Sequence, residues 1–180
     1  MIISILRLGH RLPRDERITT HVALVSRAFG TSEFIYSGQH DSSLESSVSG
    51  IVSNWGGELT VRYEKNYLNV IKKHKEDGFV VCHLTMYGMP LPGKRKNIKN
   101  AKKLLVIVGA EQVPRDVYDL ADFNIAITNQ PHSEVAALGI FLNDITDGKM
   151  LENEQFKNAK LKIVPSERGK KVEKISFPRV

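Results

Sequence analysis

Continuous apolar runs that alternate with helix-like segments are the feature of this sequence that most limits its fold. The runs lie at residues 2–8, 33–37, 59–63, 79–84, 103–108 and 124–127. They lack the strict alternation of polar and apolar residues that marks a strand with one face in water. Helix-like segments separate successive runs. This order predicts an α/β fold, with a mostly parallel sheet flanked by helices on both faces.

Local signals predict where several elements begin and end. Thr19 or Thr20 is expected to cap a helix that runs to about Phe29, where Gly30 follows. Segment 85–93 is rich in Gly and Pro, so we expect a loop there. Pro131 suits the first turn of a helix, and Asn129 or Ser133 suits its cap.

The chain is expected to have two parts of unequal size. Its 180 residues fit one domain, but the pattern of runs changes beyond residue 151. Apolar runs at 161–164 and 172–175 flank the turn-forming segment 166–169, which is typical of a β-hairpin. We therefore expect a core over 1–150 and a basic C-terminal extension over 151–180 that forms this hairpin.

Basic residues are concentrated at the end of the chain. From residue 157 to residue 180 there are eight Lys or Arg and two Glu, which matches the whole formal net charge of +6. Such a tail on a neutral body is typical of proteins that bind nucleic acid. It is equally typical of a solvated end that keeps a protein soluble, and charge alone leaves both interpretations open.

Several classes of protein and site find no support in the sequence. There is no run of about 18 apolar residues, so we expect no membrane span. The single Cys82 cannot form an internal disulfide, which favours the cytoplasm. No H-E-x-x-H motif and no pair of cysteines is present, so no metal site is expected. The glycine-rich fingerprints of dinucleotide-binding and P-loop folds are also missing.

Three of the predicted strands are followed by distinctive segments, at 84–88, 109–113 and 128–134. Because the carboxyl ends of parallel strands meet at one edge of a sheet, the three segments are expected to lie together. They offer small residues, backbone amides and apolar side chains. That combination suits an adenine-bearing cofactor held by main-chain hydrogen bonds.

Three blocks of sequence resemble a known family. They are LRLGHRLPRDERITTHVALVSRAFG (6–30), HLTMYG (83–88) and VGAEQVPRDVYDLADFNIAITNQPHSEVAALGIFL (108–142). Together they closely resemble the archaeal tRNA 2′-O-methyltransferases that act on cytidine 56, which belong to the SPOUT superfamily. The resemblance implies tRNA as the substrate, S-adenosylmethionine as the cofactor and a homodimer. It also implies a SPOUT-type core whose C-terminal part forms a trefoil knot, although knots are rare exceptions among folds.

The resemblance also implies a set of cofactor-binding residues, drawn from the ends of the three strands. They are Leu84, Gly109, Ala110, Glu111, Gln112, Val113, Thr128, Asn129, Gln130, Pro131, His132, Ser133, Glu134 and Val135. Each has a plainer interpretation. Leu84 and Val113 can be core residues, Glu111 can cap the next helix, and Pro131 and Ser133 can simply begin one.

A ribose 2′-hydroxyl must lose its proton near or during attack on a methyl group, and a nearby cation would stabilise the developing charge. Related SPOUT enzymes are thought to use an arginine of the first block, but the matching residue here is Leu24. Arg17, His21 and Arg27 are the available substitutes. We predict that Arg17 is the catalytic residue, acting from the loop before the helix. His132 is the rival, because a neutral imidazole can take the proton directly.

Two other functions stay open at this point. One is a non-enzymatic RNA-binding protein that uses the basic tail and the arginines of residues 7–17. The other is a SPOUT methyltransferase that modifies a different RNA position. A thermal shift on addition of S-adenosylmethionine would count against the first.

Overall fold

Strands and helices alternate along the chain of the computed structural model, which describes residues 1–109, 112–152 and 156–175. Their bounds are β1 Ile2–His10, α1 Glu16–Ala28, β2 Glu33–Gly38, α2 Ser42–Trp55, β3 Thr60–Tyr63, α3 Tyr67–Glu76, β4 Val80–Pro90, α4 Leu91–Lys99, β5 Lys103–Val108, α5 Arg115–Leu120, β6 Phe123–Ala126, α6 Glu134–Ile145, a 3₁₀ turn Lys149–Glu152, β7 Leu161–Ile163 and β8 Val172–Lys174.

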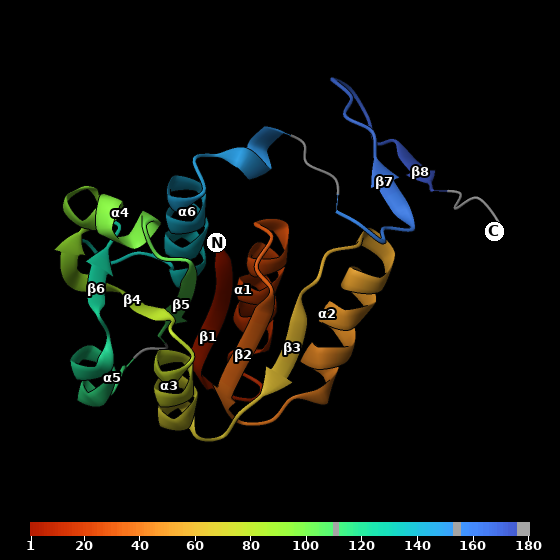
Figure 1. Ribbon diagram of the computed structural model, residues 1–180. Helices are drawn as coiled ribbons and strands as arrows, with labels where there is room; N and C mark the ends of the chain where they lie inside the picture. Colours follow the sequence, from red (N-terminus) through yellow and green to blue (C-terminus); the bar gives the residue numbers. More distant parts are fainter. Residues whose placement is uncertain (110–111, 153–155, 176–180) are drawn as a thin grey trace.

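The first six strands form one parallel sheet in the order β3-β2-β1-β5-β4-β6, visible across Figure 1. The α/β fold with a mostly parallel sheet is therefore confirmed. β1 lies in the middle, where Ile2 to Arg7 pair with Lys103 to Val108 of β5. All carboxyl ends reach the same edge of the sheet, so the loops that follow the strands lie on one side of the molecule.

Helices cover both faces of the sheet, because its central strands carry apolar side chains on both. Ile3 and Ile5 of β1 pack with buried residues of α1, α2, α4 and α6. Leu6 and Leu8, which point the other way, pack with Val70 of α3 and residues of α5. This two-sided burial explains why the strands appear in the sequence as continuous apolar runs.

Strand β4 continues through the segment that was expected to be a loop. It extends to Pro90, and α4 begins at the next residue. Its pairing with β6 is irregular, because both Leu84 and Met89 are registered against Ile125. Residues 85–88 therefore bulge out of the ladder next to the edge where the loops gather. The Gly and Pro residues mark this bulge and the following helix start, and not a long loop.

The start of α1 differs from the prediction, whereas the predicted Ser133 cap of α6 is confirmed. Helix α1 begins at Glu16, before the predicted threonine caps, and the hydroxyl of Thr19 lies 2.9 Å from the buried Nδ1 of His10 instead of capping the helix. Helix α6 begins at Glu134, where the hydroxyl of Ser133 accepts from the backbone N–H of Val135. Pro131 therefore lies before the helix and not in its first turn.

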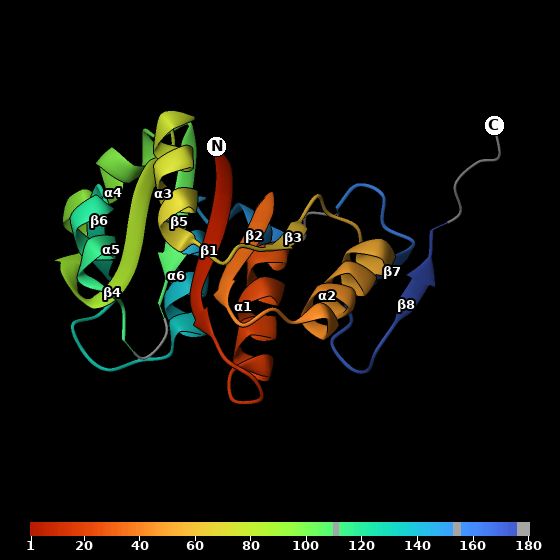
Figure 2. The ribbon, with the colours of Figure 1, turned by 90° about the horizontal axis from the view of Figure 1, so that it is seen from below.

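Strands β7 and β8 pair antiparallel, with Ile163 opposite Val172. Figures 1 and 2 show this pair beyond α2, at the end of the molecule away from β6. The N–H of Lys160 donates to the Asn54 carbonyl at 2.9 Å, which ties the segment to the end of α2. In the described parts of the chain, no helix is both long and apolar enough to cross a membrane.

Candidate functional site

A cavity of about 470 Å³ lies at the carboxyl edge of the sheet, where the three predicted loops meet. Its size is typical of small-molecule sites, which span roughly 300–1,000 Å³. The end of β4 and its bulge form one wall, the residues after β5 form a second, and the start of α6 forms a third. Six of the predicted cofactor-binding residues line it, namely Leu84, Gly109, Gln112, Val113, His132 and Glu134.

The other predicted cofactor-binding residues have different positions. Ala110 and Glu111 lie outside the described residues. Six residues are not among those that line the cavity, namely Thr128, Asn129, Gln130, Pro131, Ser133 and Val135. Among these, the Asn129 side-chain amide donates to the carbonyls of Met86 and Gly88, at 2.8 Å and 3.1 Å. The loop after β6 is thereby bound to the bulge of β4, which shapes the cavity from outside.

His83 forms part of the cavity wall and is fully buried. The amide nitrogen of Asn124 donates to the Tyr118 carbonyl at 3.0 Å, so the Asn124 oxygen is left to accept from His83 Nδ1 at 2.9 Å. Burial lowers the pKa of His83, and this hydrogen bond opposes the effect in part. The imidazole is thus held neutral, with its ring edge-on to Tyr118 at 4.7 Å between centroids.

Arg7 is a residue of the site that analysis of the sequence missed, because its charge placed it with the basic loop. The side chain is only 1% exposed. It donates to the Gly109 carbonyl, to the Leu8 carbonyl at 3.1 Å and to the Glu134 carboxylate at 3.0 Å. Burial lowers the pKa of Arg7, whereas the Glu134 charge acts in the opposite direction. An arginine inside the apolar run ISILRLG was the signal that could have revealed it.

The predicted catalytic residue, Arg17, has a different location from the loop cavity. It is the second residue of α1 rather than part of the preceding loop, and its side chain is exposed. It lines a shallow hollow together with His21 and the start of α2, including Asp41 and Ser43. It is not among the residues that line the loop cavity, so its role stays a prediction.

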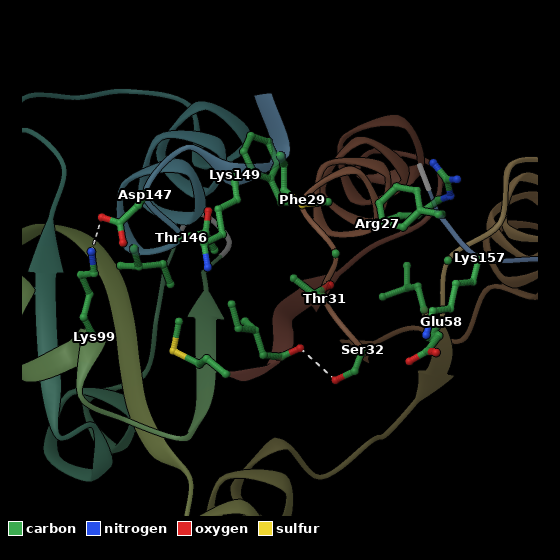
Figure 3. Close-up of a pocket in the computed structure, with 18 residues that line it drawn as sticks. Arg27, Phe29, Thr31, Ser32, Glu58, Lys99, Thr146, Asp147, Lys149 and Lys157 are labelled. Atoms are coloured by element: carbon green, nitrogen blue, oxygen red, sulfur yellow. Dashed lines mark hydrogen bonds and ion pairs between the residues drawn. The ribbon is translucent and has the colours of Figure 1, made fainter. Parts of the chain in front are cut away.

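A second cavity, of about 550 Å³, lies near the amino ends of β1 and β2 (Figure 3). Its lining mixes charges of both signs, with an ion pair between Lys99 and Asp147 and with Arg27, which donates to the Gly56 carbonyl at 3.0 Å and 2.8 Å. In parallel α/β sheets, ligands bind outside the carboxyl ends of the strands. We therefore take the loop cavity as the functional site, although it is the smaller of the two.

Several solved methyltransferase structures share the fold of this chain. Among solved structures, the chain is similar to the SpoU methyltransferase AviRb from Streptomyces viridochromogenes in complex with AdoMet, with TM-score 0.62 and 13% identity, over 83% of this chain and 58% of that one. The chain thus spans less than two thirds of AviRb. It is also similar to the A. aeolicus TrmH/SpoU tRNA modifying enzyme, with TM-score 0.61 and 15% identity, over 83% of this chain and 76% of that enzyme. These likenesses show the fold.

Two curated relatives are much closer in sequence. The tRNA (cytidine(56)-2′-O)-methyltransferase of Thermococcus kodakarensis is 50% identical over 95% of this chain and 96% of its own length. The protein of the same name from Methanopyrus kandleri is 51% identical over 95% of this chain and 96% of its own length. A family model described as tRNA ribose 2′-O-methyltransferase, aTrm56, matches residues 55–173. The chain therefore belongs to the aTrm56 family of tRNA ribose 2′-O-methyltransferases.

Proposed function

We propose that this protein transfers a methyl group from S-adenosylmethionine to the ribose 2′-hydroxyl of cytidine 56 in tRNA. The observation that carries the proposal is the loop cavity, in which the ends of β4 and β5 and the start of α6 meet. Its place at the carboxyl edge of a parallel sheet, its size and its mixed apolar and polar lining fit a nucleoside cofactor. The names of the close relatives supply the nucleotide.

The residues of the cavity divide into groups that suit different parts of such a cofactor. Leu84 and Val113 offer apolar surface for an adenine ring, and Gly109 leaves its backbone accessible. Glu134 offers a carboxylate to a cationic group. When bound, S-adenosylmethionine supplies a methyl group on a positively charged sulfur. The protein must hold the ribose hydroxyl in line with that methyl group, and positioning of this kind supplies much of the rate.

Stabilisation of the developing negative charge on the ribose oxygen is assigned to Arg17. His132 is the alternative, because a neutral imidazole can take the proton directly. His132 is exposed and lines the loop cavity, so it can face the ribose directly. Arg17 is not among the residues that line the cavity of its own chain. A homodimer in which α1 of one copy faces the loop cavity of the other would bring Arg17 to the ribose. Exposed apolar side chains such as Ile140 of α6 support association of two copies.

The remaining features implied by the family are also part of the proposal. The loop after β6 is bound to the bulge of β4 through Asn129, and the family resemblance implies that these loops belong to a trefoil knot. The basic hairpin of 151–180, as an extension of the core over 1–150, supplies lysines for the tRNA backbone. Burial raises the pKa of the lone Cys82 thiol, and a chain without a disulfide framework fits the cytoplasm.

The decisive experiment is transfer of labelled methyl from S-adenosylmethionine to unmodified tRNA, with the modified nucleoside mapped. We expect 2′-O-methylcytidine at position 56. Label at another position would replace the substrate assignment. Cofactor binding without transfer to any tRNA would contradict the enzymatic function.

Arg17→Ala is expected to lower methyl transfer by at least about a hundredfold, the scale of losing a group that stabilises developing charge. Binding of S-adenosylmethionine, measured by calorimetry, should stay nearly intact. His132→Ala should retain useful activity. A normal turnover with a raised Michaelis constant for tRNA would show that Arg17 only binds phosphate. If His132 is the base, its alanine variant should be nearly inactive and the wild-type rate should rise through the histidine range.

A further inference from the structure

The carboxyl end of β1 places a charged side chain inside the apolar layer of the fold. Arg7 points to the same face of the sheet as Ile3 and Ile5, which belong to the core beneath α1 and α6. Its side chain is 1% exposed. Burial of an unpaired guanidinium is strongly unfavourable. The fold must therefore provide partners for this group, and the identity of those partners indicates what Arg7 does.

The partners come from two of the three segments that form the loop cavity. Nη1 donates to the carbonyl of Gly109, the first residue after β5, and Nη2 donates to Glu134, the first residue of α6, at 3.0 Å. A guanidinium is planar and presents its donors in a fixed fork. One rigid group thus sets the separation between the end of β5 and the start of α6, and both of these residues line the cavity.

Glu134 connects this buried contact with the cavity itself. Its side chain is 31% exposed, and it is the one carboxylate among the described residues that line the cavity. Arg7 contacts Oε1, which leaves Oε2 for another donor or cation. The position in the first turn of α6 also favours the negative form, because a helix N-terminus carries partial positive charge.

We propose that Arg7 is a positioning residue for the cofactor, which fixes the two cavity walls and holds the Glu134 carboxylate toward the cationic part of the ligand. This inference rests on the proposed function, since S-adenosylmethionine carries a sulfonium and an ammonium group. Arg7 is too buried to touch the ligand. It acts through Glu134 and through the backbone at Gly109.

The test compares Arg7→Met, Arg7→Lys and Glu134→Gln in the full-length protein. Arg7→Met should raise both the Kd and the KM for S-adenosylmethionine by at least about tenfold, as expected when one partner of a buried charge pair is removed. The KM for tRNA should not change. Arg7→Lys should recover part of the affinity, because an ammonium reaches one of the two acceptors without the fork. Arg7→Met combined with Glu134→Gln should bind no more weakly than Arg7→Met alone.

Arg62→Met is the matched control. Arg62 also forms an ion pair with a glutamate, 2.7 Å from Glu33, but its side chain is 41% exposed and it lies on β3 at the far edge of the sheet. Its loss should lower the urea midpoint of unfolding and leave the affinity for S-adenosylmethionine unchanged. If Arg7→Met behaves in the same way, Arg7 has only a structural role and the inference is wrong.

Two further outcomes are informative. If Arg7→Met does not fold, Glu134→Gln and Arg7→Lys carry the test, and wild-type affinity for S-adenosylmethionine in both would overturn the inference. A wild-type protein that neither binds S-adenosylmethionine nor methylates tRNA would contradict the proposed function instead. The two failures are distinguished by the wild-type measurement alone.

Discussion

The backbones of β4 and β6 lie close together at Gly88, and this contact can be tested by adding one methyl group. A Cβ at this position would lie 2.6 Å from the carbonyl carbon and oxygen of Asn124 and from the nitrogen of Ile125. Carbon atoms in favourable contact are about 3.5–4.0 Å apart. The overlap is therefore close to 1 Å with the carbonyl carbon, and smaller with the oxygen and the nitrogen because their radii are smaller. Backbone atoms cannot rotate away as a side chain can, so the strands must separate.

The cost of Gly88→Ala follows from that separation. Overpacking of a well-packed region costs typically 1–3 kcal/mol, and hydrogen bonds from Asn129 to the Gly88 and Met86 carbonyls are also displaced. We expect a loss of about 3 kcal/mol in the free energy of unfolding, which lowers Tm by roughly 6–12 °C for a chain of this size. The affinity for S-adenosylmethionine should fall as well, because Thr85 and Tyr87 of the same bulge line the cavity.

Calorimetric melting and titration with S-adenosylmethionine measure the two effects. Gly50→Ala is the control, because it lies within α2 and a Cβ there meets nothing within 4 Å. In a helix interior alanine is favoured over glycine by up to about 1 kcal/mol, so this variant should be slightly more stable. A Gly88→Ala protein as stable as Gly50→Ala, with unchanged cofactor affinity, would refute the argument.

Three further predictions concern the cofactor site, the basic C-terminal extension and the stability of the protein at low pH. Gly109→Val should weaken cofactor binding sharply in calorimetry, because its Cβ overlaps a valine methyl of the same loop; unchanged affinity would contradict the placement of the loop. Reversing the charges of Lys170 and Lys171 should weaken tRNA binding and flatten its dependence on salt by up to about two slope units, whereas an unchanged slope would show that the tail is only solubilising. The hydrogen bond from His74 helps to hold the pKa of Glu33 at about 2, against 4.5 for an ordinary glutamate. The stability that Glu33 contributes above pH 4.5 is lost as the pH falls toward 2. In Glu33→Gln, the urea midpoint of unfolding should therefore depend less on pH over that range.

Much of the architecture could be predicted because it depends on local pattern. Each core strand coincides with an apolar run, and the rule that parallel strands end at one edge brought Leu84, Gly109 and Glu134 to one cavity. The pairing of one strand with another is not local. The continuation of β4 to Pro90 depends on its contact with β6, which no feature of the segment itself reveals.

Arg7 shows the same limit within the site. Counting charges grouped it with the basic residues that follow β1, but its partner Glu134 lies 127 residues further along the chain. The start of α1 was misplaced for a related reason. Thr19 has the side chain of a helix cap, but its hydroxyl is used in a buried contact with His10. In both cases a tertiary contact overrode the local preference.

The central position of β1 has a consequence for how the chain reaches its native state. During synthesis β1 obtains one neighbour early, when β2 follows, but its other neighbour, β5, begins only at Lys103. Until then one edge of β1 has no partner, and the backbone groups of Ile2 to Arg7 that later pair with β5 stay open. Contacts between residues so far apart in sequence form slowly, because loop-closure entropy is lost before the contacts compensate. The nascent chain thus exposes an open sheet edge during synthesis, the state in which intermolecular strand pairing and chaperone capture compete with folding.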